Sequence, residues 1–373
     1  MTLEEIRARI DGIDRQLLPL LTERMDCSRQ VAEVKRGTGE SVFHPDRERD
    51  ILKWAEAGAG EYADETRLVF ASLLDASRAV QHRMLGSGKE IRDLVKAAPR
   101  SLPHGNRIAC QGASGAYSHQ AALRLFPGCR PDFHKSFGGV FRALETGAAD
   151  FGLLPVENSF AGSVSEVYDL ILKYRYFIVA ATTVRVRHCL AVPRGADVAR
   201  VKEIYSHPQA LAQCSEFISS RGVRAVPYSN TAAAAEMAAE KGGNLAVICS
   251  EQAAEHFGLQ ILSRDIQNSR NNRTRFVAIC REPAIPEDAQ KISLCFSLPH
   301  TTGSLCGVLS RFAAGGLNLT KIESRPIADK NFEYDFYLDF TGNLREPRTL
   351  ALIAALHDEL PRFSFLGNYR ELA

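Results

Sequence analysis

The sequence predicts a protein of several domains, in which an all-helical segment precedes an α/β segment and a smaller α+β segment. Apolar residues recur at a helical period over residues 3–36. In the middle of the chain, short apolar strand candidates alternate with helices, and the last segment has the pattern βαββαβ. With 373 residues, the chain is long enough to bury two or three separate cores.

The composition favours a small-molecule partner. The chain has 46 basic and 44 acidic residues, and its net charge of +2 is too small for wrapping nucleic acid. No block of like charges suggests a membrane-binding arm. The nine cysteines lack the Cys-x-x-Cys or Cys/His spacing of a metal site, so we expect no metal and buried thiols in a reducing cytoplasm. The acidic first helical turn is unlike a signal peptide, and no apolar run approaches the ~20 residues of a membrane span.

Residues 1–88 are predicted to form a helical domain. A long helix over residues 3–36 begins with Thr2 and Glu5 at capping-box spacing and ends at the glycines that follow. A second helix is expected from Pro45, and a third over residues 64–85. Such helices carry more apolar surface than they can hide alone, which predicts a helical dimer.

Several polar residues on these helices are spaced for binding a small anion. Arg24 and Lys35 are three turns apart on one stripe of the first helix, about 16 Å from each other. Arg7 lies roughly 100° off that stripe, so only an antiparallel partner chain could bring it to the same pocket. Ser77 and Gln81 lie one turn apart on the third helix. For any one of these residues alone, an ordinary solvated helix position is the better interpretation.

The complete set resembles the active-site pattern of the all-helical chorismate mutases: Arg7, Arg24, Lys35, Arg47, Glu48, Ser77 and Gln81. Members of that family often have Asp where this chain has His44. The resemblance implies a pericyclic rearrangement of chorismate to prephenate, which needs no metal or cofactor. The arginines, Arg24 among them, would clamp two carboxylates. Lys35 and Gln81 would hydrogen-bond the ether oxygen, and Glu48 would take the substrate hydroxyl.

Residues 89–105 are predicted to be a linker, and residues 106–284 an α/β domain. In this domain polar residues gather at the ends of strand candidates: Ser114, Tyr117, Asn158, Ser206, Gln213, Thr274 and Arg275. The last two belong to a polar run, 271–276, set directly before the apolar strand candidate 277–280. Because ligands bind beyond the carboxyl ends of strands in open sheets, these ends are predicted to face one cleft. Ser206 is also expected to be the N-cap of a helix.

Four motifs in this domain resemble prephenate dehydratases. They are Gly112-Ala113-Ser114-Gly115-Ala116-Tyr117-Ser118-His119, Pro155-Val156-Glu157-Asn158, Ser206-His207-Pro208-Gln209 and Thr274-Arg275-Phe276. The resemblance implies two lobes around a cleft, as in periplasmic binding proteins, and loss of water and carbon dioxide from prephenate without a cofactor. Thr274 would assist the leaving hydroxyl, Arg275 would recognise a carboxylate, and the other polar residues would orient the ring. In an extended strand, however, Arg273 and Arg275 would face away from the side of Thr274.

Residues 289–373 are predicted to have the ferredoxin-like order βαββαβ. Strands are expected at 291–298, 317–322, 332–340 and 363–369, and helices at 303–312 and 346–360. Gly303-Ser304-Leu305, with Ser304 where relatives commonly have Ala, and Glu323-Ser324-Arg325-Pro326 resemble the ligand motifs of the ACT domain. The resemblance implies that paired chains bind phenylalanine as an effector and close the catalytic cleft by population shift. A purely structural dimerisation module is the alternative.

Together these motifs predict a cytoplasmic bifunctional chorismate mutase/prephenate dehydratase that forms a homodimer or larger homo-oligomer. Two alternatives stay open. One is arogenate as second substrate, in which an amino group replaces a keto oxygen. The other is a non-catalytic amino-acid sensor, because a binding-protein-like cleft joined to an ACT domain could simply bind ligands.

Overall fold

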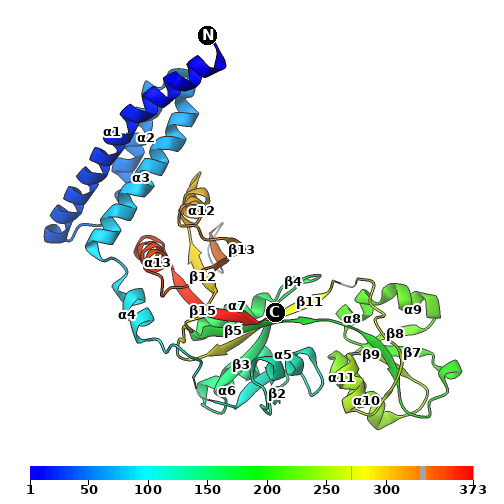
Figure 1. Cartoon of the computed structure of the whole chain (residues 1–373). Helices are drawn as coiled ribbons and strands as arrows, with labels where there is room; N and C mark the ends of the chain where they lie inside the picture. The colour runs from blue at the N-terminus through cyan, green and yellow to red at the C-terminus, as the bar shows by residue number, and fades with distance from the viewer. Residues whose placement is uncertain (104, 270, 328–332, 373) are drawn as a thin grey trace. The chain divides into compact units, whose positions relative to one another are not determined.

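The chain forms two compact units. The computed structural model describes residues 1–103, 105–269, 271–327 and 333–372. One unit comprises Met1–Ala97 with Ile292–Phe365, and the other Ala98–Lys291 with Leu366–Ala373 (Figure 1). The last strand, β15 (Ser364–Leu372), therefore supplies residues to both units.

The N-terminal helices match their predicted extents closely. In α1 (Leu3–Thr38), Thr2 Oγ1 accepts from the Glu5 N–H at 3.2 Å, and Glu5 accepts from the Thr2 N–H at 2.7 Å, which completes the predicted capping box. A short 3₁₀ helix, η1 (Gly60–Tyr62), separates α2 (Pro45–Gly58) from α3 (Ala63–Leu85). Much of the apolar surface of α1 stays exposed, at Leu3, Ile6, Ile10, Ile13, Leu17, Leu18, Leu20, Leu21, Val31 and Val34. One chain therefore does not cover this helix.

Part of the segment predicted as a linker is helical. Residues 89–97 form α4 (Lys89–Ala97), in which Ile91 and Val95 lie one turn apart and are buried. This short apolar pair is the helical signal that the surrounding glycines and prolines obscure.

The C-terminal elements of the first unit follow the predicted order βαββαβ. They are β12 (Lys291–Ser297), α12 (Ser304–Ala314), β13 (Leu319–Pro326), β14 (Tyr334–Thr341), α13 (Pro347–Glu359) and β15. The strands are ordered β13-β14-β12-β15, and Phe312 packs on Phe340 with ring centres 4.7 Å apart. Phe332, the first residue of the predicted strand 332–340, lies outside the described residues.

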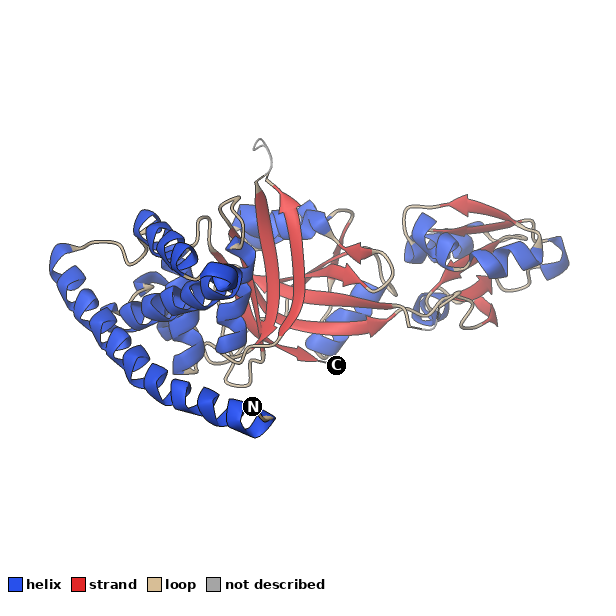
Figure 2. Cartoon of the chain, turned by 90° about the horizontal axis from the view of Figure 1, so that it is seen from above, coloured by secondary structure: helices blue, strands red, loops and turns tan. Residues whose placement is uncertain are grey.

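The second unit consists of two lobes, each with its own sheet (Figure 2). The first lobe has strand order β15-β5-β11-β3-β1-β2, with β4 beside β3. Its elements are β1 (Ile108–Gln111), α5 (Tyr117–Leu125), β2 (Asp132–His134), α6 (Phe137–Glu145), β3 (Phe151–Asn158), β4 (Gly162–Ser163), α7 (Ser165–Tyr174), β5 (Phe177–Arg185) and β11 (Arg273–Cys280). Ile108, Phe151 and Phe276 belong to its buried core.

The second lobe has strand order β10-β6-β9-β7-β8. Its elements are β6 (Cys189–Val192), η2 (Val198–Arg200), β7 (Glu203–Ser206), α8 (Pro208–Gln213), α9 (Ser215–Arg221), β8 (Arg224–Pro227), α10 (Thr231–Lys241), β9 (Ala246–Cys249), α11 (Glu251–His256) and β10 (Gln260–Ser263). The chain enters and leaves this lobe along neighbouring segments, since Val186 N donates to Asn272 O at 2.9 Å and His188 N to Gln267 Oε1 at 2.9 Å. Residues at this double crossing lie where the lobes meet.

Two local predictions were wrong by a small shift along the chain. β11 begins at Arg273, so most of the predicted polar run lies inside the strand and not before it. Ser206 ends β7, and its Oγ donates to Ile248 O at 2.6 Å. The N-cap of α8 is His207, whose Nδ1 accepts from the Gln209 N–H at 3.2 Å. Ser206 is fully buried in the sheet and satisfied there.

We expect Gly367→Ala to destabilise the second unit by about 2–4 kcal/mol. Gly367 has φ of +155°, and a Cβ at this position would lie 2.1 Å from the carbonyl oxygen of Ile178. Calorimetric unfolding measures the effect. Gly37→Ala, in α1 with no atom within 4 Å of the added Cβ, is the matched control and should unfold at or slightly above the native temperature. Equal unfolding temperatures for the two variants would contradict this account of β15.

Candidate active sites

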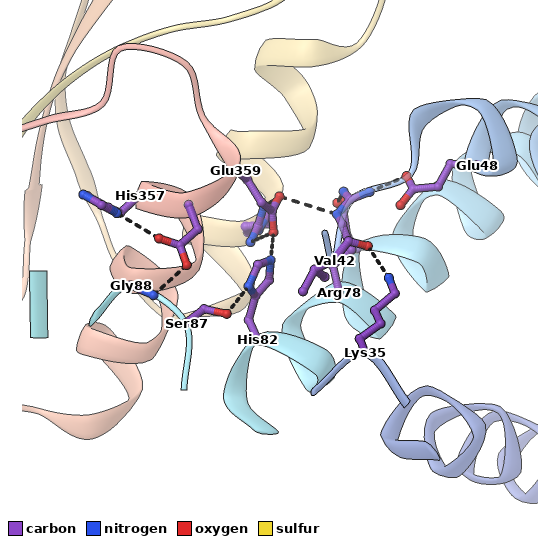
Figure 3. A network of polar contacts seen from close by, with 12 residues as sticks. Lys35, Val42, Glu48, Arg78, His82, Ser87, Gly88, His357 and Glu359 are labelled. Atoms are coloured by element: carbon purple, nitrogen blue, oxygen red, sulfur yellow. Dashed lines mark hydrogen bonds and ion pairs between the residues drawn. The ribbon is translucent and has the colours of Figure 1, made fainter. Parts of the chain in front are cut away.

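The helical module gathers part of the predicted anion-binding set. Arg24 Nη1 donates to Ser77 Oγ at 2.5 Å and to Leu73 O at 3.1 Å, which joins α1 to α3. Lys35 is only 8% exposed, and its Nζ donates to Val42 O at 3.0 Å (Figure 3). Burial lowers the pKa of Lys35, while the carboxylates of Glu40 and Glu48 act in the opposite direction. Lys35 therefore lies within electrostatic reach of Glu48, as the predicted site requires.

Gln81 is a buried group that lacks a partner. It is 8% exposed, and within the described residues its Oε1 has no hydrogen-bond partner. Because an unpaired buried amide oxygen lowers stability, such a group is typical of a site that a ligand completes. By contrast, Arg7 and Arg47 are exposed, and no recorded hydrogen bond or ion pair joins them to the rest of the set within the described part of this chain.

One residue of this region escaped the sequence analysis. Arg78, next to Ser77, pairs with Glu48 and Asp75 and is 13% exposed (Figure 3). The sequence gives little indication that Arg78 belongs to the site, since an arginine on a helix is usually a solvated surface residue. Only packing reveals that this one is buried.

A cavity of about 380 Å³ lies between the two lobes of the second unit. Four of the predicted residues line it, namely Tyr117, Asn158, Gln213 and Thr274. Ser114, Ser206 and Arg275 do not. The predicted cleft thus exists, with a smaller set of the proposed side chains.

A chain of hydrogen bonds runs along this cleft from one lobe to the other. Asn158 Nδ2 donates to Thr274 Oγ1 at 2.9 Å and to Asn272 Oδ1 at 2.8 Å. Asn272 Nδ2 donates to Gln213 Oε1 at 2.9 Å, and His188 Nε2 lies 2.9 Å from the same oxygen. With that oxygen accepting twice, His188 is protonated on Nε2. Burial lowers the pKa of His188 and so favours the neutral imidazole, while the hydrogen bond with Gln213 acts in the opposite direction.

Two of these residues, Asn272 and His188, were not named as candidates. Asn272 is 3% exposed and His188 2% exposed, at the two chain crossings between the lobes. Asn272 lies in the polar run that the sequence marks. His188 follows β5 with no motif around it, and its Nδ1 lies 3.3 Å from the Tyr117 hydroxyl, a contact that depends on the tertiary structure.

Arg275 faces away from the cleft. Strand β11 pairs with β3 on one side and β5 on the other, with Thr274 opposite Asn158 and Val184. Side chains alternate along it, so Thr274 and Phe276 line the cavity and Arg275 does not. Its Nε lies 2.7 Å from Glu371 Oε1, and its Nη2 donates to the Tyr369 hydroxyl at 2.6 Å. The predicted role of Arg275 in binding a carboxylate is therefore corrected to an ion pair within the protein.

The charge of the cleft is set by the backbone. Among the described residues, no Lys, Arg, Asp or Glu side chain lines the cavity. Several helices begin at it, however, among them α5 with Ala116 and Tyr117, and α10 with Asn230 and Thr231. Helix N-termini carry partial positive charge and unpaired N–H groups, so the cleft is suited to anions.

Two residues of the first predicted effector motif line a small cavity in the first unit. Ser304 and Leu305, in the first turn of α12, line a space of about 200 Å³ together with Tyr334 and Phe336. In the β13–β14 pair, Phe336 is opposite Ser324 and Tyr334 is opposite Pro326. Gly303, with φ of +85°, directly precedes the helix. Glu323 pairs with Lys321 at 3.3 Å. Of the predicted effector residues, five do not line the cavity, namely Gly303, Glu323, Ser324, Arg325 and Pro326.

Among the described residues, no group of three or more His, Cys, Asp or Glu side chains is placed to hold a metal. In the same part of the chain, no helix combines the length and apolar character needed to cross a membrane.

The chain is similar to proteins that carry two catalytic domains. Residues 6–82 match the family model of type II chorismate mutases, and residues 108–284 that of prephenate dehydratases. The bifunctional chorismate mutase/prephenate dehydratase of Escherichia coli (strain K12) is 31% identical over 376 residues, which covers 98% of this chain and 95% of the relative.

A plant relative and a solved structure each match about 70% of the chain. The chloroplastic arogenate dehydratase/prephenate dehydratase 2 of Arabidopsis thaliana is 37% identical over 275 residues, covering 70% of this chain and 72% of the relative. The prephenate dehydratase of Arthrobacter aurescens, solved in complex with L-Phe, has a TM-score of 0.65 at 30% identity, over 71% of this chain and 90% of its own.

Both family matches and the relative that spans nearly the whole chain identify the same pair of activities. The chain therefore belongs to the bifunctional chorismate mutase/prephenate dehydratases, and it converts chorismate to prephenate and prephenate to phenylpyruvate.

Proposed function

We propose that the mutase reaction takes place in a pocket built by α1, α2 and α3 and completed by Arg7 of a second chain. The buried Lys35 beside Glu48 and the Arg24–Ser77 contact support this pocket. Arg24 and the partner's Arg7 clamp the carboxylates of chorismate, with Arg47 at the rim. Lys35, through Nζ, and Gln81, through Nε2, donate hydrogen bonds to the ether oxygen as negative charge grows there.

A dimer of the helical module follows from the exposed apolar face of α1. A helix of 36 residues with ten exposed apolar side chains is unstable in water without cover. An antiparallel copy buries this face and carries Arg7 towards the other end of the partner helix. The pocket then holds the flexible chorismate dianion in a compact shape. A rate acceleration of ~10⁶ corresponds to a lowering of the activation free energy by about 8 kcal/mol, which electrostatic stabilisation and restricted geometry supply.

Thr274 is the proposed leaving-group contact of the dehydratase reaction. The observation that carries this role is that Thr274 Oγ1 accepts the hydrogen bond of Asn158 Nδ2 at 2.9 Å. The hydroxyl proton of Thr274 has no recorded acceptor among the described residues, and Thr274 lines the cavity. It is therefore available to the ring hydroxyl of prephenate.

The rest of the cleft holds and orients the substrate. The ring hydroxyl takes the proton of the Thr274 hydroxyl, which solvent replaces, and leaves as water. The bond to the ring carboxylate breaks to release carbon dioxide, and that electron pair completes the aromatic ring. Because aromatisation supplies most of the driving force, positioning and polarisation suffice. The N-terminal ends of α5 and α10 attract the two carboxylates, and Asn158 and Gln213 orient the ring through the hydrogen bonds of the cleft.

Prephenate fits the cleft better than arogenate. Arogenate carries an ammonium group where prephenate has a keto oxygen, and among the described residues no Asp or Glu lines the cavity to pair with it. The plant relative named for both substrates keeps arogenate as the second candidate. Steady-state comparison of the two substrates on the purified protein decides between them.

Phenylalanine is the proposed effector, bound between Ser304, Leu305, Tyr334 and Phe336. The aromatic walls suit a phenyl ring, and the similar Arthrobacter aurescens structure is a complex with L-Phe. This supports an ACT function for the C-terminal module. A cytoplasmic location is proposed because all nine cysteines are free thiols and seven of them are buried.

Lys35→Ala should lower mutase turnover by about 10²–10³-fold, because it removes the charged donor to the ether oxygen. Dehydratase turnover of the same protein should stay native. Separate assays with chorismate and prephenate measure the two activities. Lys53→Ala, a lysine on the exposed side of α2, is the control and should leave both unchanged. Native mutase turnover of the Lys35→Ala protein would show that this pocket is not the mutase active site.

Thr274→Ala should lower dehydratase turnover by about 10²–10³-fold and leave the mutase unaffected, since it removes the proton that assists the leaving hydroxyl. Thr274→Ser, which keeps a hydroxyl, should recover part of the activity. Phenylpyruvate formation from prephenate is the measurement. Equal activity of the alanine and serine variants would rule out a role for the hydroxyl.

Phenylalanine should inhibit the dehydratase of the native protein, and Ser304→Trp should be inhibited much less, because the indole fills the cavity of about 200 Å³. Titration of dehydratase activity with phenylalanine measures both. Cys306→Ser, on the exposed side of α12, should respond as the native protein does. Native enzyme that is indifferent to phenylalanine would defeat the regulatory proposal.

A further inference from the structure

Arg78 is a buried arginine to which the proposed mutase chemistry gives no role. Its side chain is 13% exposed and pairs with acids from three helices, namely Glu48 of α2, Asp75 of α3 and Glu359 of α13 (Figure 3). The guanidinium carbon also lies 5.1 Å from the ring centre of Phe43. Because the donors of a guanidinium are fixed in one plane, these partners together determine its orientation.

Arg78 holds one oxygen of Glu48 and leaves the other available. Nη1 of Arg78 pairs with Oε2 of Glu48. Within the described residues, Oε1 of Glu48 has no recorded hydrogen-bond partner, and the proposed mutase site uses this carboxylate to take the substrate hydroxyl. A carboxylate fixed through one oxygen presents the other in a constant place, which is what positioning of a reacting group requires.

Glu359 anchors Arg78 from the C-terminal module, residues 292–365. Its carboxylate accepts two bonds from Arg311 of α12 at 2.6 and 3.0 Å. It also lies 2.6 Å from His82 Nε2 and 3.5 Å from Arg78 Nε. Burial opposes its ionisation, but the contact with His82 and the guanidinium groups of Arg311 and Arg78 outweigh burial and lower the pKa of Glu359 to about 2. Glu359 is therefore charged at neutral pH and held on several sides.

We propose that Arg78 is a positioning residue of the mutase reaction and that Glu359 is its second anchor, so that the C-terminal module helps to hold the Glu48 carboxylate in place. This inference rests on the proposed role of Glu48. The competing explanation is a cluster of ion pairs that only fastens α3 to α12 and α13. A mere fastening would change the stability of the first unit and leave the turnover of the folded enzyme unchanged.

The test uses the full chain and three conservative substitutions. Arg78→Gln should lower mutase kcat by about 10- to 100-fold, and Glu359→Gln by about 5-fold, with KM changed less than about two-fold. Asp358→Asn is the matched control, because Asp358 is the neighbour of Glu359 on α13, accepts from the Gly88 N–H at 2.7 Å and makes no recorded contact with Arg78. It should keep native mutase kcat. Dehydratase kcat should be native in all three.

A double substitution separates positioning from fastening. In a Glu48→Gln background, Glu359→Gln should cause no further loss of mutase kcat, because the carboxylate that the chain of contacts holds is already absent. Additive losses would overturn the inference. Native mutase kcat in both Arg78→Gln and Glu359→Gln, with only a lower unfolding temperature, would also overturn it.

The same series distinguishes this inference from the proposal on which it rests. If Glu48→Gln itself has native turnover, the proposed role of Glu48 fails and the inference fails with it. If Glu48→Gln is impaired while Arg78→Gln and Glu359→Gln are native, the inference alone fails. Should Arg78→Gln not fold, as judged by lost dehydratase activity, Glu359→Gln and its double variant still decide the question.

Discussion

The pairing of β11 between β3 and β5 is the constraint on which the dehydratase unit depends. It places Thr274 opposite Asn158 and fixes which face of the sheet each side chain occupies. Thr274 and Phe276 therefore belong to the cleft, while Arg275 between them pairs with Glu371 and Tyr369 of β15. A shift of one residue in this register would exchange the two faces and remove the hydroxyl from the cleft.

A dianionic substrate must be held although no Lys or Arg lines the cleft among the described residues. The conspicuous arginine of the Thr274-Arg275-Phe276 motif is committed to an ion pair inside the protein. Positive potential comes instead from the beginnings of α5 and α10, whose first residues line the cavity. Backbone dipoles attract carboxylates without supplying an acid or base of their own, which suits a reaction driven by aromatisation.

The helical module depends on a different constraint, which is burial of charge. Lys35 is buried within electrostatic reach of Glu48, and Glu48 in turn pairs with Arg78. Since a buried charge is tolerated only with partners, each of these residues limits the positions of the others. The long helix α1 has the opposite property, because its apolar residues remain exposed in one chain. The exposed apolar face supports the proposed second copy as its cover, while the charged centre is already ordered within one chain.

Local sequence patterns determined most of the elements. The capping box at Thr2, the proline that begins α2 and the apolar periods of the C-terminal module place their elements to within a few residues, because caps and periodicity act over neighbouring positions. The motifs also determined the family, and four of the predicted site residues line the cleft. Helix α4 and the N-cap at His207 escaped this reading, since short signals compete with the glycines, prolines and serines beside them.

Only the tertiary structure decided how side chains far apart in sequence share one environment. The sequence shows the polar run at Thr274, but it does not predict that Arg275 donates a hydrogen bond to Tyr369, almost a hundred positions later. Nor does it single out His188, Asn272 or Arg78, because a lone His, Asn or Arg has no local signature of burial. Their roles arise from strand register and helix packing, which are long-range properties, whereas the residue types and spacing that identify the family are carried by the sequence itself.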